Sequence, residues 1–283
     1  MTVLTETVPL ANGTQIPVVG FGTWLLKEGD ECYHAVSEAL RLGYRHIDPA
    51  RAYYNEASVG RAIRDSGVPR EQIYVTSKLP AEAKSYGEAV AEFETTMTEI
   101  GLDYLDLYLV HAPWPWNEMG KDCRAENKEI WKAMEEFLAS GRVKAIGVSN
   151  FDPDDLASLL PACRVLPMVN QIRWFVGLDP SATVEACKAN GIVVEAYSPF
   201  AHGLIVNHPE LSDIAARYDV SAPQLCIRYL LQKGAVVLPK ATSTPHIQQN
   251  AELAFEISDA DMAILDGMCA TEKHPDAVEF RWS

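Results

Sequence analysis

The chain has 283 residues, of which 48% are hydrophobic and 22% are charged, the balance of a soluble globular protein. Its formal net charge of −15 argues against nucleic acid or an anionic membrane surface as a partner. No apolar run approaches the ~20 residues that cross a bilayer. The opening residues MTVLTETVPL have no basic region followed by an apolar core, so we expect no signal peptide and a cytoplasmic protein.

The chain begins with a predicted β-hairpin in residues 7–20, where Asn12 and Gly13 stand between two extended runs. Asn-Gly is a pair that favours a tight turn between antiparallel strands. We place this hairpin ahead of the main fold, where it should close the N-terminal end of the structure that follows.

Eight short runs rich in β-branched and apolar residues follow, at 18–24, 44–48, 73–79, 105–112, 143–150, 168–174, 192–199 and 235–241. Most of them are almost continuously apolar, as expected for strands buried on both faces. Segments between them have helical spacing, at 31–43, 85–101, 127–141, 152–163, 179–191, 221–234 and 244–254. Several of these open with a Ser, Thr or Asp suited to capping a helix N-terminus. The stretch 43–60 likewise begins as a strand and ends as a helix.

This repeated alternation of strands and helices, without a Pro-, Gly- or Ser-rich linker, predicts a single domain over residues 1–283. Either a closed (β/α)8 barrel or an open doubly wound sheet could accommodate it. The doubly wound alternative requires a phosphate loop after an early strand, and the sequence contains neither G-x-G-x-x-G nor a Walker motif. We therefore predict an α/β fold of the (β/α)8 TIM-barrel type, with the N-terminal hairpin capping the bottom of the barrel.

The six cysteines are scattered without a C-x-x-C pair or His-rich spacing. This distribution fits reduced thiols better than a disulfide framework or a zinc site. We expect no metal centre.

Polar residues stand at the C-terminal ends of the predicted strands, which is where barrels of this kind carry their chemistry. In chain order they are Trp24, Asp48, Lys78, His111, Ser149, Asn150, Gln171, Tyr197 and Lys240. Taken singly, each has an ordinary structural explanation, such as a salt bridge at the mouth of the barrel or a hydrogen-bonded packing residue. Their convergence on one rim is harder to explain structurally.

Three of these residues, Asp48, Lys78 and His111, together with Tyr53 suggest proton transfer to a carbonyl oxygen. A tyrosine hydroxyl has an ordinary pKa of ~10, too high for ready proton exchange at neutral pH. An adjacent ammonium, Lys78, would lower that pKa, and a carboxylate behind it, Asp48, would hold the ammonium in place. A neighbouring imidazole, His111, could then orient the carbonyl.

The chain resembles the aldo-keto reductase family over essentially its whole length. The motifs GFGTW, GYRHID, NEASVG, VTSKL, LDLYLVH, GVSNF, NQI, AYSP and PKA…HIQQN stand in family order with compatible spacing. The resemblance implies a (β/α)8 barrel that transfers hydride between a nicotinamide cofactor and an aldehyde or ketone, an oxidoreductase of small carbonyl compounds. It also implies a catalytic tetrad at Asp48, Tyr53, Lys78 and His111.

The resemblance further implies a nicotinamide cofactor along the strand ends and the last loops. It assigns the carboxamide to Ser149, Asn150 and Gln171, with Tyr197 stacked on the ring. The remaining cofactor residues would be Gly22, Thr23, Asp48, Ser198, Phe200, Lys240, Ala241, Thr242, Ser243, His246, Gln249 and Asn250. Members that use NADPH usually have a hydroxyl residue after the lysine and an arginine near the following helix start, where this chain has Ala241 and His246. A histidine ring cannot make the bidentate hydrogen bonds that an arginine makes to a phosphate. NADPH is therefore favoured less strongly than it would be with an arginine, and NADH is the alternative cofactor.

Trp24, Tyr53, His111 and Trp114 are the predicted substrate-binding residues, with Trp116 in the same aromatic loop. Pro80 and Ala112 replace two tryptophans that are frequent in the family, and Pro49 and Tyr54 also depart from its pattern. The short tail at 274–283 resembles that of a bacterial branch similar to 2,5-diketo-gluconate reductases and prostaglandin F synthases. It implies an open site for small aldehydes, dicarbonyls and keto sugars, and the resemblance favours a monomer.

Two other functions are compatible with a barrel of this kind. One is a cofactor-binding sensor or scaffold without turnover, against which the intact tetrad argues. The other is a Schiff-base aldolase with Lys78 as the nucleophile, which would leave the polar residues at Ser149, Asn150 and Lys240 without a purpose.

Overall fold

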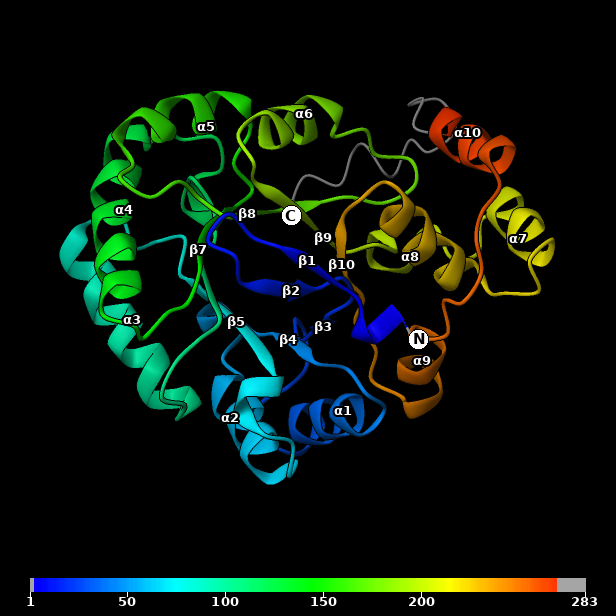
Figure 1. Ribbon diagram of the computed structural model, residues 1–283, viewed down its shortest axis with the longest axis horizontal. Coiled ribbons are helices and arrows are strands. Elements are labelled where there is room, and N and C mark those ends of the chain that lie inside the picture. The colour runs from blue at the N-terminus through cyan, green and yellow to red at the C-terminus, as the bar shows by residue number, and fades with distance from the viewer. Residues whose placement is uncertain (1–2, 269–283) are drawn as a thin grey trace.

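The computed structural model describes residues 3–268, and within this range eight parallel strands form a nearly closed barrel surrounded by helices (Figure 1). Each strand pairs with its neighbours in chain order, from β3 to β10. The strands are β3 (Phe21–Gly22), β4 (His46–Asp48), β5 (Tyr74–Leu79), β6 (Leu107–Val110), β7 (Ile146–Ser149), β8 (Val169–Arg173), β9 (Val193–Tyr197) and β10 (Val236–Leu238). The predicted (β/α)8 barrel is confirmed.

The barrel closes where the last strand meets the first. Val237 of β10 donates its N–H to the carbonyl of Val18 at 2.9 Å, and Gly20 donates to the carbonyl of Val237 at 2.9 Å. A side chain at Gly20 would not fit, because a Cβ atom there would lie 2.5 Å from Leu238 Cδ2 and 2.8 Å from His46 Nδ1. The seam therefore depends on a glycine packed against the interior of the barrel.

The helices cover the outside of the barrel, and their apolar faces form one continuous core with the strands. They are α1 (Asp30–Arg41), α2 (Glu56–Asp65), α3 (Tyr86–Ile100), α4 (Arg124–Ala139), α5 (Pro153–Leu159), α6 (Ser181–Ala189), α7 (Pro209–Ala216), α8 (Ala222–Gln232), α9 (Thr244–Gln249) and α10 (Asp259–Gly267). Short 3₁₀ turns lie between them at η1 (Val3–Thr5), η2 (Arg51–Tyr53), η3 (Arg70–Gln72), η4 (Trp116–Glu118), η5 (Leu160–Ala162) and η6 (Ala201–Gly203). The sequence patterns did not predict α7 or α10.

Side-chain caps fix the starts of several helices, as the sequence indicated. Ser85, Asp152 and Ser221 each accept a hydrogen bond from the backbone three residues later and complete a capping box. These caps satisfy backbone donors that would otherwise be left without a partner at the helix start.

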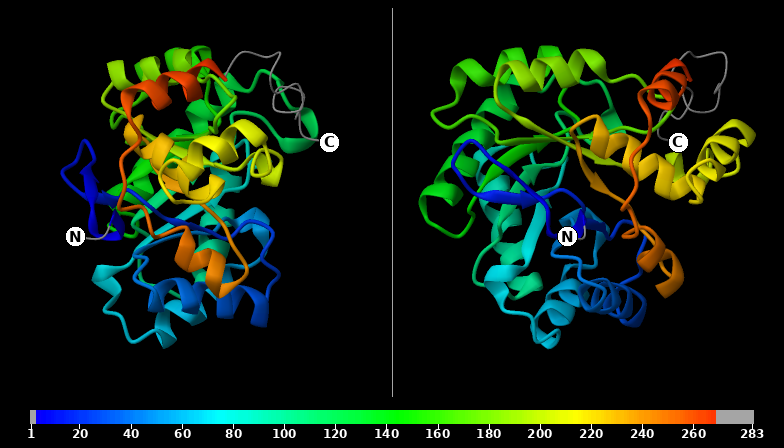
Figure 2. Two further views of the ribbon diagram at one scale, coloured as in Figure 1. Left: turned by 90° about the vertical axis from the view of Figure 1, so that its right-hand side faces the viewer. Right: turned by 45° about the vertical axis from the view of Figure 1, so that its right-hand side comes forward.

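The N-terminal hairpin closes the bottom of the barrel, at the end opposite the strand C-termini (Figure 2). Strands β1 (Thr7–Pro9) and β2 (Gln15–Pro17) pair antiparallel, and Gly13 takes the turn with φ +85°. Ile16 packs in a core cluster with residues of the barrel strands, and the Asn12 amide donates to the carbonyl of Lys144 at 2.8 Å. The prediction of a capping hairpin is confirmed.

Among residues 3–268, no helix is both long enough and apolar enough to cross a membrane. The tail at 274–283, from which an open site was predicted, lies outside the described residues.

Candidate active site

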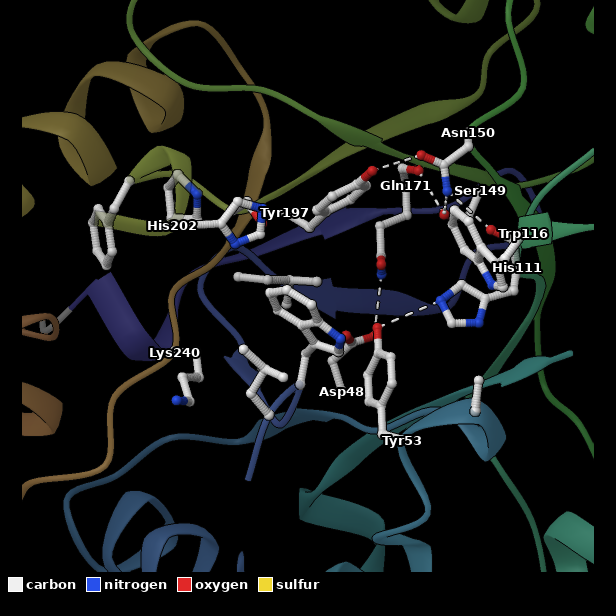
Figure 3. A pocket seen from close by; sticks show the side chains of 18 of the residues that line it. Asp48, Tyr53, His111, Trp116, Ser149, Asn150, Gln171, Tyr197, His202 and Lys240 are labelled. Carbon is white, nitrogen blue, oxygen red and sulfur yellow. Dashed lines mark hydrogen bonds between the residues drawn. The ribbon is translucent and has the colours of Figure 1, made fainter. Parts of the chain in front are cut away.

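The C-terminal ends of the barrel strands surround one cavity of about 700 Å³ (Figure 3). This volume lies within the range of small-molecule binding sites. Most of the predicted site residues line it: Gly22, Trp24, Asp48, Tyr53, His111, Ser149, Asn150, Gln171, Tyr197, Ser198, Phe200 and Lys240. Strand ends far apart in the sequence therefore meet at one site, as predicted.

A buried ion pair lies beneath the cavity. Lys78 stands in β5, whose residues are all buried, and its side chain is fully buried. Its Nζ atom donates to Asp48 Oδ2 at 2.7 Å and to the carbonyl of Pro49 at 3.0 Å. A buried charge is tolerated only when it is paired and hydrogen-bonded, and both conditions are met here.

Tyr53 follows Asp48 on a short 3₁₀ turn, η2, which turns the phenol back over the barrel mouth. The Lys78 ammonium lies 5.1 Å from the centroid of the Tyr53 ring. The Tyr53 hydroxyl lies 3.5 Å from His111 Nε2. The turn ends at Tyr54, which is 72% exposed and takes the left-handed conformation with φ +54°, uncommon for a bulky residue. Tyr54, one of the departures from the family's pattern, is therefore accommodated with backbone strain.

The electrostatics at Tyr53 differ from the sequence-based expectation that a neighbouring ammonium lowers its pKa. Burial raises the pKa of Tyr53 well above its ordinary value, and the carboxyls of Asp48 and Glu195 add to the rise. Desolvation and the two carboxyls thus outweigh Lys78. The phenol stays protonated at neutral pH, the form that a proton donor requires.

His111 lies at the end of β6 with its ring buried. Burial lowers its pKa well below the ordinary value, and the nearby Lys78 ammonium lowers it further. The imidazole is therefore neutral at neutral pH. Its Nδ1 atom has no hydrogen-bond partner among the described residues.

A chain of hydrogen bonds connects the next three strand ends. The Tyr197 hydroxyl donates to Asn150 Oδ1 at 2.7 Å, and the Asn150 amide donates to the carbonyl of His111 at 2.9 Å and to Ser149 Oγ at 3.0 Å. Ser149 Oγ donates to the carbonyl of Gln171 at 2.8 Å. These bonds hold the side chains of Ser149, Asn150 and Tyr197 in fixed orientations at the wall of the cavity, with the backbone of β8 as one acceptor.

Gln171 connects this wall to the ion pair. Its amide nitrogen donates to Asp48 Oδ1 at 3.1 Å and to Glu195 Oε2 at 2.6 Å. Because both carboxyls use this nitrogen, the amide oxygen is the group that Gln171 can offer to a ligand.

A second polar layer, which the sequence patterns did not predict, lies below the cavity. Glu195 and His46 are fully buried, with His46 Nε2 3.7 Å from Glu195 Oε1 and 3.0 Å from Thr76 Oγ1. Burial raises the pKa of Glu195 to about 8, and the neighbouring Asp48 adds to the rise, whereas burial lowers the pKa of His46 to about 3. Burial also raises the pKa of Asp48, against the opposing effects of Lys78 and Gln171. The available signal was a glutamate inside the otherwise apolar run IVVEAYSP.

Several predicted cofactor residues lie away from the lining of this cavity. Thr23 is buried, and its hydroxyl donates to the carbonyl of Asp48 at 3.3 Å. The other predicted residues stand in or next to α9, beyond Lys240: Ala241, Thr242, Ser243, His246, Gln249 and Asn250. The cavity thus brings together the predicted residues at the strand ends, and the residues around α9 lie outside its lining.

Aromatic side chains form the outer walls of the cavity. Trp116 lines it and meets His111 edge to face, with ring centroids 5.3 Å apart. Trp114, which was predicted to bind substrate, lies next to Trp116 at 5.2 Å and does not line the cavity. On another wall, Trp24 meets His202 of η6 with ring centroids 4.9 Å apart. Leu25, Ala52, Pro199, His202, Gly203 and Leu238 also line the cavity and were not predicted.

The backbone around the cavity is strained at several points. Four lining residues other than glycine take a positive φ: Leu25 at +63°, Asn150 at +63°, Ser198 at +52° and His202 at +57°. Such conformations cost of order 1–3 kcal/mol each and tend to gather at functional sites. Here they turn the chain at the ends of the barrel strands.

An eight-stranded barrel with a tyrosine, a buried lysine–aspartate pair and a histidine at its mouth is the arrangement expected of the class that the sequence motifs resemble, the aldo-keto reductases. Comparison with known proteins is consistent with this class. The family model described as "Aldo/keto reductase family" matches residues 18–270. The glyoxal reductase of Bacillus subtilis is 38% identical over 283 residues, covering 99% of both chains.

Solved structures agree with the sequence comparison. An aldo/keto reductase from Brucella melitensis superposes with a TM-score of 0.87 at 36% identity, covering 95% of this chain and 98% of that one. A Bombyx mori aldo-keto reductase in complex with NADP superposes with a TM-score of 0.85 at 32% identity, covering 93% and 92%. The chain belongs to the aldo/keto reductase family of oxidoreductases.

The raised pKa of Glu195 predicts how stability depends on pH. The folded protein keeps the Glu195 proton up to about pH 8, whereas the ordinary value of 4.5 lets the unfolded chain lose it much earlier. Glu195 therefore lowers the free energy of unfolding progressively between these two values. Between pH 5 and pH 8, the free energy of unfolding of the wild type should fall by roughly 2–4 kcal/mol relative to that of Glu195→Gln. Urea unfolding at the two pH values measures this difference.

Glu56 provides a graded comparison, because burial raises its pKa to about 7. Glu56→Gln should also gain stability relative to the wild type as pH rises, but over a narrower range that ends near pH 7. A stability difference between wild type and Glu195→Gln that is the same at pH 5 and pH 8 would contradict the prediction.

Proposed function

We propose that this chain reduces small aldehydes and ketones, including dicarbonyls and keto sugars, to alcohols with NADPH. The observation that carries the proposal is the position of the Tyr53 hydroxyl, 3.5 Å from His111 Nε2, in a cavity above the buried Lys78–Asp48 pair. The glyoxal reductase relative and the NADP-bound silkworm neighbour support the substrate class and the cofactor.

The residues of the cavity fit a nicotinamide group. The Gln171 amide oxygen and the Ser149–Asn150 pair are polar groups held in place beside the Tyr197 ring. The Gln171 oxygen and the Ser149–Asn150 pair suit the carboxamide of a nicotinamide, and the Tyr197 ring suits its planar heterocycle. When bound there, NADPH supplies the hydride. Lys240 lines the same cavity and adds a positive charge suited to a phosphate.

Tyr53 then donates its proton to the carbonyl oxygen of the substrate. The neutral His111 ring orients that oxygen beside the phenol, and its neutrality avoids a competing charged donor. As negative charge develops on the phenol, the Lys78 ammonium near its ring stabilises it. Asp48 keeps that ammonium in position.

The same geometry argues against an aldolase that uses Lys78 as its nucleophile. The Lys78 amine is fully buried and donates to both Asp48 and the carbonyl of Pro49. An ammonium held this way neither reaches a substrate carbonyl nor has a free electron pair to attack it.

Tyr53→Phe should lower kcat for a small aldehyde by roughly 10²- to 10⁴-fold, since this is the usual contribution of a positioned acid. Dissociation constants for NADPH should stay within about twofold, because the phenol is not needed to hold the cofactor. Steady-state kinetics and fluorescence titration measure the two effects.

Tyr54→Phe is the matched control, because this neighbouring tyrosine is 72% exposed. It should keep its full reductase rate. A Tyr53→Phe protein that retains most of the wild-type kcat would exclude Tyr53 as the proton donor.

Trp116 should govern the size and affinity of the substrates, because it forms the wall beside His111. Trp116→Ala should raise KM for an aromatic aldehyde by about tenfold, the loss of roughly 1–2 kcal/mol of ring contact. The change for methylglyoxal should be smaller. Trp114→Ala, one ring further from the cavity, should affect both substrates less, and an equal or larger effect of Trp114→Ala would contradict the assignment.

His246 should set the preference between the two cofactors if α9 faces the 2′-phosphate. His246→Arg introduces a guanidinium that can form a bidentate pair with that group. We expect the ratio of kcat/KM for NADPH over NADH to rise about tenfold. Gln248→Arg adds the same charge at another exposed position of α9 and serves as the control. Equal ratios in the two variants would place the phosphate elsewhere.

A further inference from the structure

Two carboxyl groups lie side by side beneath the cavity, and the proposed proton transfer uses only one of them. Asp48 is 3% exposed and Glu195 is fully buried. The Gln171 amide nitrogen bridges them, 3.1 Å from Asp48 Oδ1 and 2.6 Å from Glu195 Oε2. One neutral amide thus links a carboxyl of the ion pair to a carboxyl outside it.

The charges around this pair do not balance if both carboxyls are ionised. Lys78 is the single cation that faces them among the described residues, and the His46 ring beside Glu195 is neutral at neutral pH. The titratable groups facing Glu195 come from β4, β5 and η2: His46, Asp48, Tyr74, Lys78 and Tyr53. Since the site is buried, two carboxylates against one ammonium would leave a dehydrated net charge. One proton on the pair restores neutrality.

The geometry shows which carboxyl holds that proton. Asp48 contacts the Lys78 ammonium at 2.7 Å and is therefore the ionised member. Glu195 Oε1 has no hydrogen-bond partner among the described residues, and its nearest ring nitrogen, His46 Nε2, is 3.7 Å away. An unpaired oxygen is far less costly to bury on a neutral acid than on a carboxylate.

We propose that Glu195 is a positioning residue whose proton is coupled to the oxidation state of the cofactor held at Gln171. This inference rests on the proposed function. The oxidised nicotinamide ring carries a positive charge that the reduced ring lacks, and a positive charge close to an acid favours its ionised form. Binding of NADP⁺ therefore releases the Glu195 proton to solvent, leaving a carboxylate, whereas binding of NADPH leaves the acid intact.

The coupling has a definite direction with pH. At high pH Glu195 is already ionised, and the negative charge stabilises NADP⁺ without a proton having to leave. The affinity for NADP⁺ relative to NADPH therefore increases as pH rises. In the protonated form, Glu195 keeps the site neutral under the reduced cofactor and leaves Tyr53 facing one carboxylate instead of two.

The test uses the full chain with Tyr53→Phe, which removes turnover and the ionisation of the phenol. Fluorescence titration gives Kd for NADP⁺ and NADPH at pH 6 and pH 9. We expect the ratio Kd(NADP⁺)/Kd(NADPH) to fall about tenfold, the order expected for a unit charge several ångströms away in a partly polar interior. Protonation of the 2′-phosphate affects both nucleotides and cancels in the ratio.

Glu195→Gln, added to this protein, should make the ratio independent of pH within about twofold. Glu56→Gln is the control, because Glu56 is also buried with a raised pKa but bonds to Ser77, outside the carboxyl pair. It should retain the full shift. A pH-dependent ratio that survives Glu195→Gln would overturn the inference.

Calorimetry tests the same idea without a substitution at Glu195. Titrations in two buffers of different ionisation enthalpy at pH 7.5 count the protons released. NADP⁺ should release more protons than NADPH. If both dinucleotides bind tightly and release equal numbers of protons, this inference alone is overturned. If neither dinucleotide binds, the proposed cofactor site is overturned and this inference with it.

Discussion

The buried contact between Lys78 and Asp48 is the interaction on which the rest of the site depends. An ammonium with no exposed surface is stable only if its hydrogen bonds are met, and here a carboxylate and the carbonyl of Pro49 meet them. Adjacent parallel strands, β4 and β5, bring the two side chains together at the same end of the barrel. Loss of either partner would leave an uncompensated charge in the interior, so the pair ties the stability of the barrel to its chemistry.

The neighbouring polar groups are connected to that pair by hydrogen bonds. Gln171 joins Asp48 to Glu195, and the Ser149–Asn150–Tyr197 chain joins Gln171 to the wall of the cavity. Each group is fixed by its neighbours, which is the condition for a site whose dipoles need little rearrangement during a reaction. The phenol and the imidazole, by contrast, make only a long contact of 3.5 Å with each other at the cavity surface.

The sequence was sufficient for the architecture because strand runs and glycine-terminated helices have strong local signals. The eight runs, the Asn12–Gly13 turn and the capping residues Ser85 and Ser221 all appear where expected. Helices α7 and α10 are second helices, beside α8 after β9 and beyond α9 after β10, which a simple alternation of strand and helix does not predict. The strand ends also identified most of the cavity lining, because position along a barrel strand fixes the rim to which a residue belongs.

What the sequence could not provide were properties that arise from packing. Whether Trp114 or Trp116 reaches the cavity depends on how one loop folds over His111. The raised pKa of Tyr53 depends on desolvation and on two carboxyls, Asp48 and Glu195, of which Glu195 lies on β9, far away in the sequence. A charge pattern in the sequence indicates which groups come together, but not how strongly the fold desolvates them.

The hairpin separates the two ends of the barrel by role: the lower end is structural, and the upper rim carries the cavity. Ile16 packs the hairpin against the lower end of the barrel and Asn12 anchors it there, whereas the cavity opens among the loops of the upper rim. Loops at that rim can then lengthen, shorten or exchange residues without loosening the packing at the lower end. Such a scaffold can acquire new substrates by local changes, and a family built on it can diversify widely while keeping one mechanism.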